Sequence, residues 1–314
     1  MFDVDGPSEK VLSTPALDVE TKLKIRAWEV DESPIDLGYR IVEDWPKLPS
    51  GWKLGPVASV AADSRERYYI FHRGDEAPPL MCFDKHGEYL FSWGEGEFVR
   101  PHRIFIDDED NLWLVDEGEH ILYHFNPEGE LLRKLGTKGV QGEDGTHFYR
   151  PTDITPGLNG HFYVSDGYGN NRVAWFDKDF NFLGQWGTEG KGIGEFVLPH
   201  AITTDPEGLV YVCDRNRWRV QIFTPEGEYM TMWTHIGKAY QIVYTPDDCF
   251  FICDGFNSRV WKLEKSGKII GFFASRTPER VASGETTVHD MALAPNGDIL
   301  LAHLDGVVQL FSPL

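Results

Sequence analysis

Three histidines occupy the same place in a phrase that recurs along this 314-residue chain. His102 and His200 each follow a proline, in GEFVRPHRIFIDDEDN and GEFVLPHAITTDPEG, and His289 occurs in the related stretch TTVHDMALAPNG. Neutral imidazole is a common zinc ligand, and three imidazoles with an open fourth position form a typical catalytic zinc site. The pattern therefore predicts a metal centre, provided that the fold brings the three side chains together.

The elements that must position these histidines belong to a sequence repeat. A short apolar strand closes on Asp or His six times, at His72, Asp116, Asp166, Asp214, Asp254 and His303. Each unit contains four short apolar stretches separated by turns rich in Gly, Pro, Asn and Asp, and such stretches at even spacing indicate an all-β array. Four strands per unit of about forty to fifty residues are typical of propeller blades. We therefore predict an all-β, six-bladed β-propeller with four-stranded antiparallel blades.

The last unit ends at FSPL after only three strands. A closed ring leaves no unpaired strand edge, so the fourth strand should come from the N-terminal region. YRIVEDW at 39–45 is the best candidate for this closing strand. We accordingly predict one propeller over residues 36–314 and an irregular or helical lead-in over residues 1–35.

The histidines lie at the start of the first strand of their units. Counting back fourteen residues from the strand-closing position, or thirteen in the fifth unit, gives Ala58, His102, Thr152, His200, Gln241 and His289. First strands are innermost in a propeller, so imidazoles from alternate blades, about 120° apart, should converge on the axis. A lone histidine at a strand start is more often a hydrogen-bonded core residue than a ligand, but duplication alone would not favour histidine in every second unit.

Composition excludes several classes of partner. The formal net charge of −20 disfavours nucleic acid and anionic membranes, which attract basic surfaces. The N-terminal residues lack the features of a signal peptide, and no apolar run is long enough to span a bilayer. The four cysteines contain no CxxC pair, which predicts a reduced, cytoplasmic protein. A propeller is self-sufficient, so a monomer is the default expectation.

Further motifs fall in one order along the six units. They are FHRGD (71–75), RPHRI (100–104), HFYRPTD (147–153), SDGYGNNRV (165–173), LPHAI (198–202), DRNRWRVQ (214–221) and VHD (288–290). With the glycine-containing linkers that precede the Pro-His pairs, residues 55–314 resemble the NHL-repeat propellers. The full set of motifs resembles the catalytic core of the peptidyl-α-hydroxyglycine α-amidating lyases.

This resemblance implies roles for individual residues. It implies zinc bound by His102, His200 and His289, and catalysis by Tyr168 with Arg73 and Arg215. It also implies a structural calcium bound by Asp290 and by the backbone carbonyls of Val57 and Ile104. The implied reaction cleaves the N–C bond of a carbinolamide, a small-molecule substrate, to an amide and glyoxylate.

The positions of Arg73, Tyr168 and Arg215 agree with these roles. Each follows a strand-closing residue by one or two positions, so each should lie at the same mouth of the propeller as the histidines. A tyrosine there could act as general base and an arginine could bind a carboxylate bidentately. Without the resemblance, however, the arginines would read as surface ion-pair residues and the tyrosine as a turn aromatic. Asp290 could then simply brace His289.

Some positions depart from the amidating-lyase pattern, and other functions stay open. Tyr149, Gly169, Tyr211 and Ile222 stand where secreted relatives carry disulfide cysteines, which fits a reducing compartment. Thr287 and Val288 replace two residues on the pocket side of the third histidine.

A zinc-dependent hydrolase of a lactone, amide or activated C–C bond would use the same three histidines. A non-catalytic interaction propeller is the second alternative.

Overall fold

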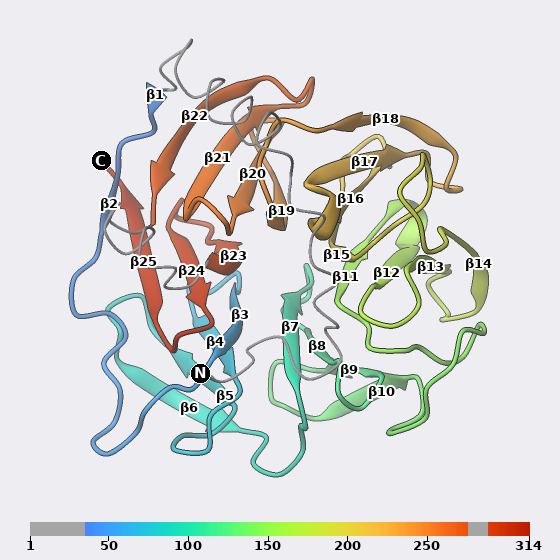
Figure 1. Cartoon of the computed structure of the whole chain (residues 1–314). Coiled ribbons are helices and arrows are strands. Elements are labelled where there is room, and N and C mark those ends of the chain that lie inside the picture. Colours follow the sequence, from blue (N-terminus) through green and yellow to red (C-terminus); the bar gives the residue numbers. More distant parts are fainter. Residues whose placement is uncertain (1–34, 276–287) are drawn as a thin grey trace.

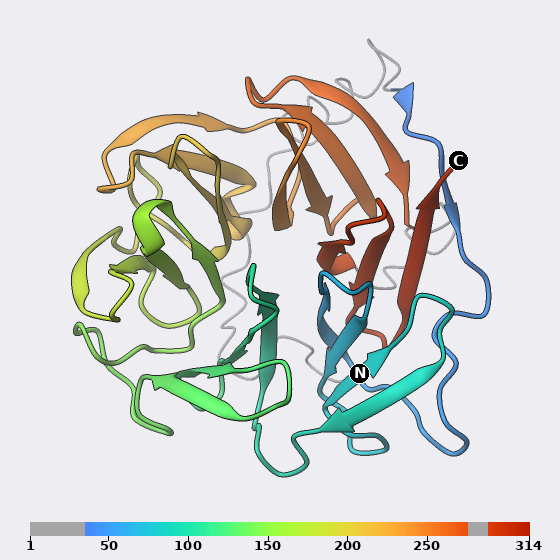
Figure 2. The same ribbon diagram turned by 180° about the vertical axis from the view of Figure 1, so that it is seen from behind.

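The computed structural model describes residues 35–275 and 288–314. Their strands form six sheets arranged in a ring around a central axis, as Figure 1 shows from one face and Figure 2 from the other. No α-helix is present in this described part of the chain. The predicted six-bladed, all-β propeller is thus confirmed.

Each blade runs from an innermost first strand to an outermost fourth strand. Blade 1 consists of β3 (Val57–Ala62), β4 (Tyr68–His72), β5 (Leu80–Phe83) and β6 (Tyr89–Trp93). Blade 2 consists of β7 (Pro101–Ile106), β8 (Leu112–Asp116), β9 (Ile121–Phe125) and β10 (Leu131–Leu135). Blade 3 consists of β11 (Asp153–Pro156), β12 (Phe162–Asp166), β13 (Arg172–Phe176) and β14 (Phe182–Trp186). Blades 4 and 5 consist of β15 (Pro199–Thr204), β16 (Val210–Asp214), β17 (Arg219–Phe223) and β18 (Tyr229–Trp233); and β19 (Ala239–Thr245), β20 (Cys249–Asp254), β21 (Arg259–Glu264) and β22 (Ile269–Ala274).

Blade 6 is closed by an N-terminal strand. It combines β23 (Val288–Leu293), β24 (Ile299–His303) and β25 (Val308–Pro313) with β2 (Tyr39–Ile41), which pairs antiparallel with β25. Figure 1 shows β2 in blue beside β25 in red. This confirms the predicted closing strand, although it ends at Ile41. The preceding strand β1 (Ile35–Asp36) adds in parallel to β22, a pairing that the repeat did not predict.

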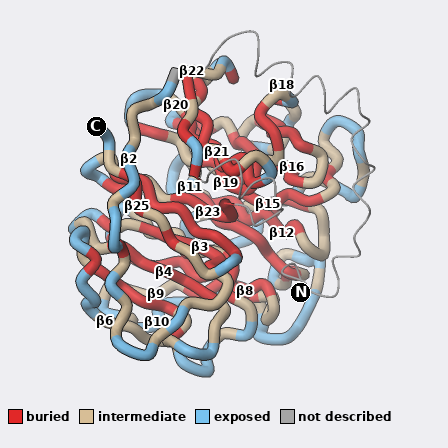
Figure 3. Tube along the Cα trace, turned by 60° about the vertical axis from the view of Figure 1, so that its left-hand side comes forward, coloured by how far each residue is buried: buried red, intermediate tan, exposed pale blue. Residues whose placement is uncertain are grey.

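The core lies between adjacent blades. The second strands, such as β8 and β16, are buried along their whole length, whereas the outermost strand β10 is exposed at four of its five residues. Figure 3 shows this gradient from buried inner strands to an exposed rim. One apolar cluster joins Tyr211 of blade 4 to Phe250 and Trp261 of blade 5. Because each sheet is covered on both faces by its neighbours, the whole ring supports the position of the innermost strands.

The first strands of five blades contain a β-bulge at their start. The register shifts lie between Val57 and Ser59, Pro101 and Arg103, Pro199 and Ala201, Ala239 and Gln241, and Val288 and Asp290. The extra residue in blades 2, 4 and 6 is the histidine, and in blade 5 it is Tyr240. The sequence-based assignment of Gln241 to this position was therefore wrong by one residue. Fourteen residues separate Tyr240 from Asp254, as in the other blades.

Further predictions concerned the N-terminal lead-in, the cysteines and membrane-spanning segments. The predicted lead-in over 1–35 lies outside the described residues except for Ile35. All four cysteines have free thiols. Among the described residues, no helix is long and apolar enough to cross a membrane.

Candidate metal centre

The three predicted histidines meet on the propeller axis. Their ring centroids are 5.0 Å (His102–His200), 5.2 Å (His102–His289) and 5.0 Å (His200–His289) apart. One potential ligand atom from each lies within 4.8 Å of the other two, and all three side chains are buried. Three buried imidazoles in this arrangement could hold a metal ion.

Backbone carbonyls of the neighbouring blades orient the imidazoles. Nδ1 of His102 donates to the Thr152 carbonyl at 2.6 Å, and Nδ1 of His200 donates to the Tyr240 carbonyl at 2.7 Å. Nδ1 of His289 donates to the Ala58 carbonyl at 2.7 Å. Each carbonyl therefore comes from the bulge or strand-start position of an odd-numbered blade. Histidine blades alternate with acceptor blades, and every Nε2 is left to face the axis.

The Nε2 atoms lack the donors that neutral imidazoles would need. With Nδ1 protonated, each Nε2 is an acceptor. The phenol oxygen of Tyr168 lies 3.1 Å from Nε2 of both His102 and His200, but it carries one hydrogen. Nε2 of His289 is buried with no hydrogen-bond partner. Within residues 35–275 and 288–314, three Nε2 lone pairs thus share a single O–H donor, and three such lone pairs suit a cation such as Zn²⁺.

Burial also keeps these imidazoles neutral. It lowers the pKa of His102 and His200 well below the ordinary value of 6.5. Burial, with the nearby charge of Arg73, lowers the pKa of His289 to about 4. Neutral imidazole is the form that binds metal, so at neutral pH all three histidines are in the protonation state that can bind a metal ion.

We expect the metal-free protein to lose stability as the pH falls from about 6.5 to about 4. In this interval the unfolded chain protonates His289 but the native protein does not, so the free energy of unfolding decreases with decreasing pH. Across this interval, protonation of His289 in the unfolded chain alone should reduce the free energy of unfolding by about 3 kcal/mol. Urea titrations of EDTA-treated protein at several pH values would measure it. His289→Asn, which retains an N–H for the Ala58 carbonyl, should show a shallower pH dependence; an unchanged slope would contradict the assignment.

Tyr168 is placed over the axis by the turn after β12. The preceding residue, Gly167, lies against the carbonyl of Pro199, and any Cβ there would collide with that oxygen. Nη1 of Arg215 donates to the phenol oxygen at 3.3 Å. The Arg215 side chain is buried and stacks over the ring of Tyr240, 4.8 Å from its centroid. Phenol, guanidinium and imidazoles therefore form one constellation, as predicted from their positions in the repeat.

A second arginine at Tyr168 was not predicted from the sequence. The guanidinium carbon of Arg150 lies 5.0 Å from the centroid of the Tyr168 ring. Its Nε donates to the Glu117 carboxylate at 2.6 Å, and Arg100 donates to the other oxygen of Glu117. The signal was the Arg-Pro pair that occurs at 100–101 and again at 150–151.

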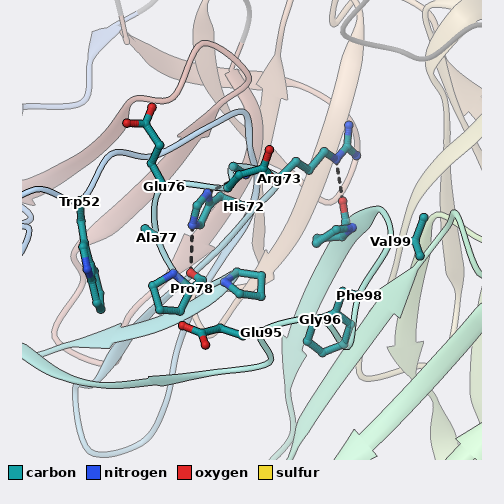
Figure 4. A pocket seen from close by; sticks show the side chains of 14 residues that line it. Trp52, His72, Arg73, Glu76, Ala77, Pro78, Glu95, Gly96, Phe98 and Val99 are labelled. Carbon is teal, nitrogen blue, oxygen red and sulfur yellow. Dashed lines mark hydrogen bonds between the residues drawn. The ribbon is translucent and has the colours of Figure 1, made fainter.

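Arg73 lines a side cavity between blades 1 and 2 and also contacts the strand that carries His102. Its Nε donates to the carbonyl of Pro101 at 2.7 Å, next to His102, and its charge lowers the pKa of both His102 and His289. The cavity has a volume of about 560 Å³ and is lined by Trp52, Phe98 and Arg73, among others. Figure 4 shows Arg73 extending from the cavity wall, and His72 bound to the Pro78 carbonyl at 2.9 Å.

The contacts around Asp290 do not fit the predicted calcium. Its carboxylate oxygens accept hydrogen bonds from Arg103 Nη1 at 2.8 and 3.0 Å, from Gln241 Nε2 at 2.8 Å and from the Val60 amide at 3.1 Å. Calcium instead requires six to eight oxygen ligands. Val57 and Ile104 are buried on the adjacent strands β3 and β7. Thr287 lies outside the described residues, and Val288 is buried in β23.

Comparison with known proteins places this architecture in a family. The model of the NHL repeat matches residues 196–223, which include His200 and Arg215. The human "NHL repeat-containing protein 3" is 32% identical over 236 residues, covering 70% of this chain and 67% of that protein. This chain belongs to the NHL repeat family. The matched repeat lies in blade 4, which carries His200 and Arg215.

This NHL propeller is also similar to an amidating lyase. The "Probable peptidyl-alpha-hydroxyglycine alpha-amidating lyase pgal-1" of Caenorhabditis elegans is 27% identical over 288 residues, which cover 81% of each protein. Among solved structures, virginiamycin B lyase from Staphylococcus aureus matches with a TM-score of 0.62 at 10% identity, covering 88% of this chain and 100% of that one. At this identity the second likeness shows the fold alone.

Proposed function

We propose that this protein is a zinc-dependent lyase that cleaves the N–C bond of an α-hydroxy-N-acyl amino acid. The products would be an amide and a glyoxylate-type acid. One observation carries the proposal: three buried, neutral Nε2 acceptors converge beside a single phenol that is itself contacted by a buried guanidinium. The similarity to an amidating lyase over 81% of the chain supports the same reaction class.

His102, His200 and His289 would hold the zinc ion through Nε2. Bound zinc would supply Lewis-acid chemistry that polarises the α-hydroxyl oxygen of the substrate. The Nδ1–carbonyl bonds of all three imidazoles keep their tautomers and ring orientations fixed, so the ligand atoms need not rearrange when metal binds.

Tyr168 would move the proton on which the cleavage depends. As a phenolate, Tyr168 would take the proton of the substrate hydroxyl while the C–O bond becomes the carbonyl of glyoxylate. The electrons of the breaking C–N bond would pass to nitrogen, and Tyr168 would return the same proton to this nitrogen to complete the amide. The guanidinium of Arg215, 3.3 Å from the phenol oxygen, favours the anionic form of the phenol during this transfer.

Arg73 would bind the carboxylate of the substrate. Its charge acts on both His102 and His289, and guanidinium matches carboxylate geometry bidentately. The neighbouring cavity of about 560 Å³, with Trp52 and Phe98 in its walls, offers room for the acyl group. The proposed substrate thus carries its carboxylate toward the axis and its acyl group toward blades 1 and 2.

Product analysis with N-benzoyl-α-hydroxyglycine tests the reaction. The zinc-loaded protein should release benzamide and glyoxylate in equal amounts, with no oxygen from the solvent in the benzamide. A hydrolase acting on the acyl–N bond would instead release benzoate that carries one solvent oxygen, measurable by mass spectrometry in ¹⁸O-labelled water. Neither product from protein that holds about one zinc ion per chain would contradict the proposed reaction.

A further inference from the structure

A second ring of side chains lies directly below the three imidazoles. It is formed by the residues that follow the strand-start position in five blades, and these are Ser59, Arg103, Asp153, Gln241 and Asp290. Arg103 follows His102, and Asp290 follows His289. The bulges place consecutive residues in two successive layers, so one layer can bind metal while the next holds a polar network.

Arg103 is the cation of this network. Its Nε donates to Asp153 Oδ1 at 2.8 Å, and its Nη1 donates to Asp290 Oδ2 at 2.8 Å. Both carboxylates are buried, and the Arg103 side chain is only 12% exposed. Two buried anions require a positive partner, because the penalty for removing their charge from water is large.

The same two carboxylates connect the innermost strands of all six blades. Asp290 of blade 6 accepts from Ser59 Oγ of blade 1 and from Gln241 Nε2 of blade 5. Asp153 of blade 3 accepts from the Ile202 amide of blade 4 at 3.2 Å, and Arg103 contributes blade 2. One guanidinium therefore bridges the two carboxylates of a cluster on which every blade converges, and it offsets one of their two negative charges.

The network also divides the axis into two parts. A cavity of about 10 Å³, roughly the space of one water molecule, lies between Arg103 and the imidazoles. A second cavity of about 130 Å³ lies below, lined by Arg103, Ile104 and Met291, among others. Arg103 is shared by both cavities and so stands between the metal centre and the opposite mouth.

We infer that Arg103 is a built-in axial cation, which takes the place that the family resemblance gives to structural calcium. A planar guanidinium supplies fixed N–H donors to the two carboxylates, and one of these, Asp290, is the side-chain ligand that the resemblance implies for calcium. The integrity of this propeller should therefore be independent of calcium.

Calcium content and thermal stability of the zinc-loaded protein test this inference. After incubation with CaCl₂ and gel filtration into calcium-free buffer, elemental mass spectrometry should find less than about 0.1 calcium per chain. The melting temperature should not differ between calcium-free buffer and buffer with CaCl₂. About one retained calcium per chain, with a melting temperature that rises by several degrees in CaCl₂, would overturn the inference.

Charge removal tests the role of Arg103 itself. Arg103→Met leaves two buried carboxylates without their cation, and its melting temperature should fall by about 10 °C. Adding Asp290→Asn removes one of the unpaired charges and should restore part of this loss. Arg40→Met, at an exposed position of β2, is the matched control and should melt like the native protein. A double variant that is less stable than Arg103→Met would contradict an ionic role, and the calcium measurement decides even if Arg103→Met fails to fold.

Discussion

His200→Ala is expected to lose both its metal and its lyase activity. The substitution removes one of three convergent imidazoles, and two ligands cannot hold zinc in the arrangement that a catalytic site requires. Zinc content should fall from about one to below about 0.1 per chain. Glyoxylate release should fall at least about a thousandfold, since loss of the Lewis acid removes several kcal/mol of transition-state stabilisation.

The fold should survive this substitution. The Tyr240 carbonyl loses the N–H of His200, which costs about 1–3 kcal/mol, while the blade contacts are untouched. Circular dichroism and calorimetry would verify that the variant is native. His86→Ala, at an exposed position, is the control and should retain zinc and activity. Native protein that turns over the substrate without bound metal would contradict the zinc-dependent reaction.

Tyr168→Phe should separate catalysis from metal binding. Phenylalanine keeps the ring that lies against Arg150 and Arg215 but removes the O–H group that lies 3.1 Å from Nε2 of both His102 and His200. We expect kcat to fall about 10²- to 10⁴-fold, the usual contribution of a positioned general base, with zinc content unchanged. Steady-state kinetics and elemental mass spectrometry on the same sample would measure both.

The pH profile gives this prediction a second readout. If Tyr168 is the base, the residual activity of the phenylalanine variant should no longer follow the ionisation that limits the native enzyme at low pH. Tyr149→Phe, which removes a neighbouring phenol, is the matched control and should leave kcat within about twofold. Equal kcat in Tyr168→Phe and native protein would remove Tyr168 from the mechanism.

The repeat made the fold and the histidine centre predictable. Six units imply six blades, and a shared position within the unit implies a shared place at the axis, so His102, His200 and His289 could be brought together without coordinates. The closing strand followed from the missing fourth strand of blade 6. These features depend on periodicity, which a single sequence displays.

Features that depend on local geometry could not be predicted in this way. The bulge before Gln241 adds a residue that strand alternation does not reveal, so Tyr240 was missed. Arginine is usually exposed, and nothing in the letters around Arg103 shows that Asp153 and Asp290, 50 and 187 residues away, accept its hydrogen bonds. Asp290 was consequently assigned to calcium through the resemblance.

Histidine blades and acceptor blades alternate, so the residues that supply the imidazoles and the residues that orient them lie in different blades. The imidazoles are oriented by main-chain oxygens of residues 58, 152 and 240, and a main-chain oxygen is present whatever side chain the residue carries. The side chains at these three positions can therefore change without disturbing the tautomers of the ligands. A propeller built in this way can vary the buried side chains beside its histidines while the orientation of the imidazoles remains constant.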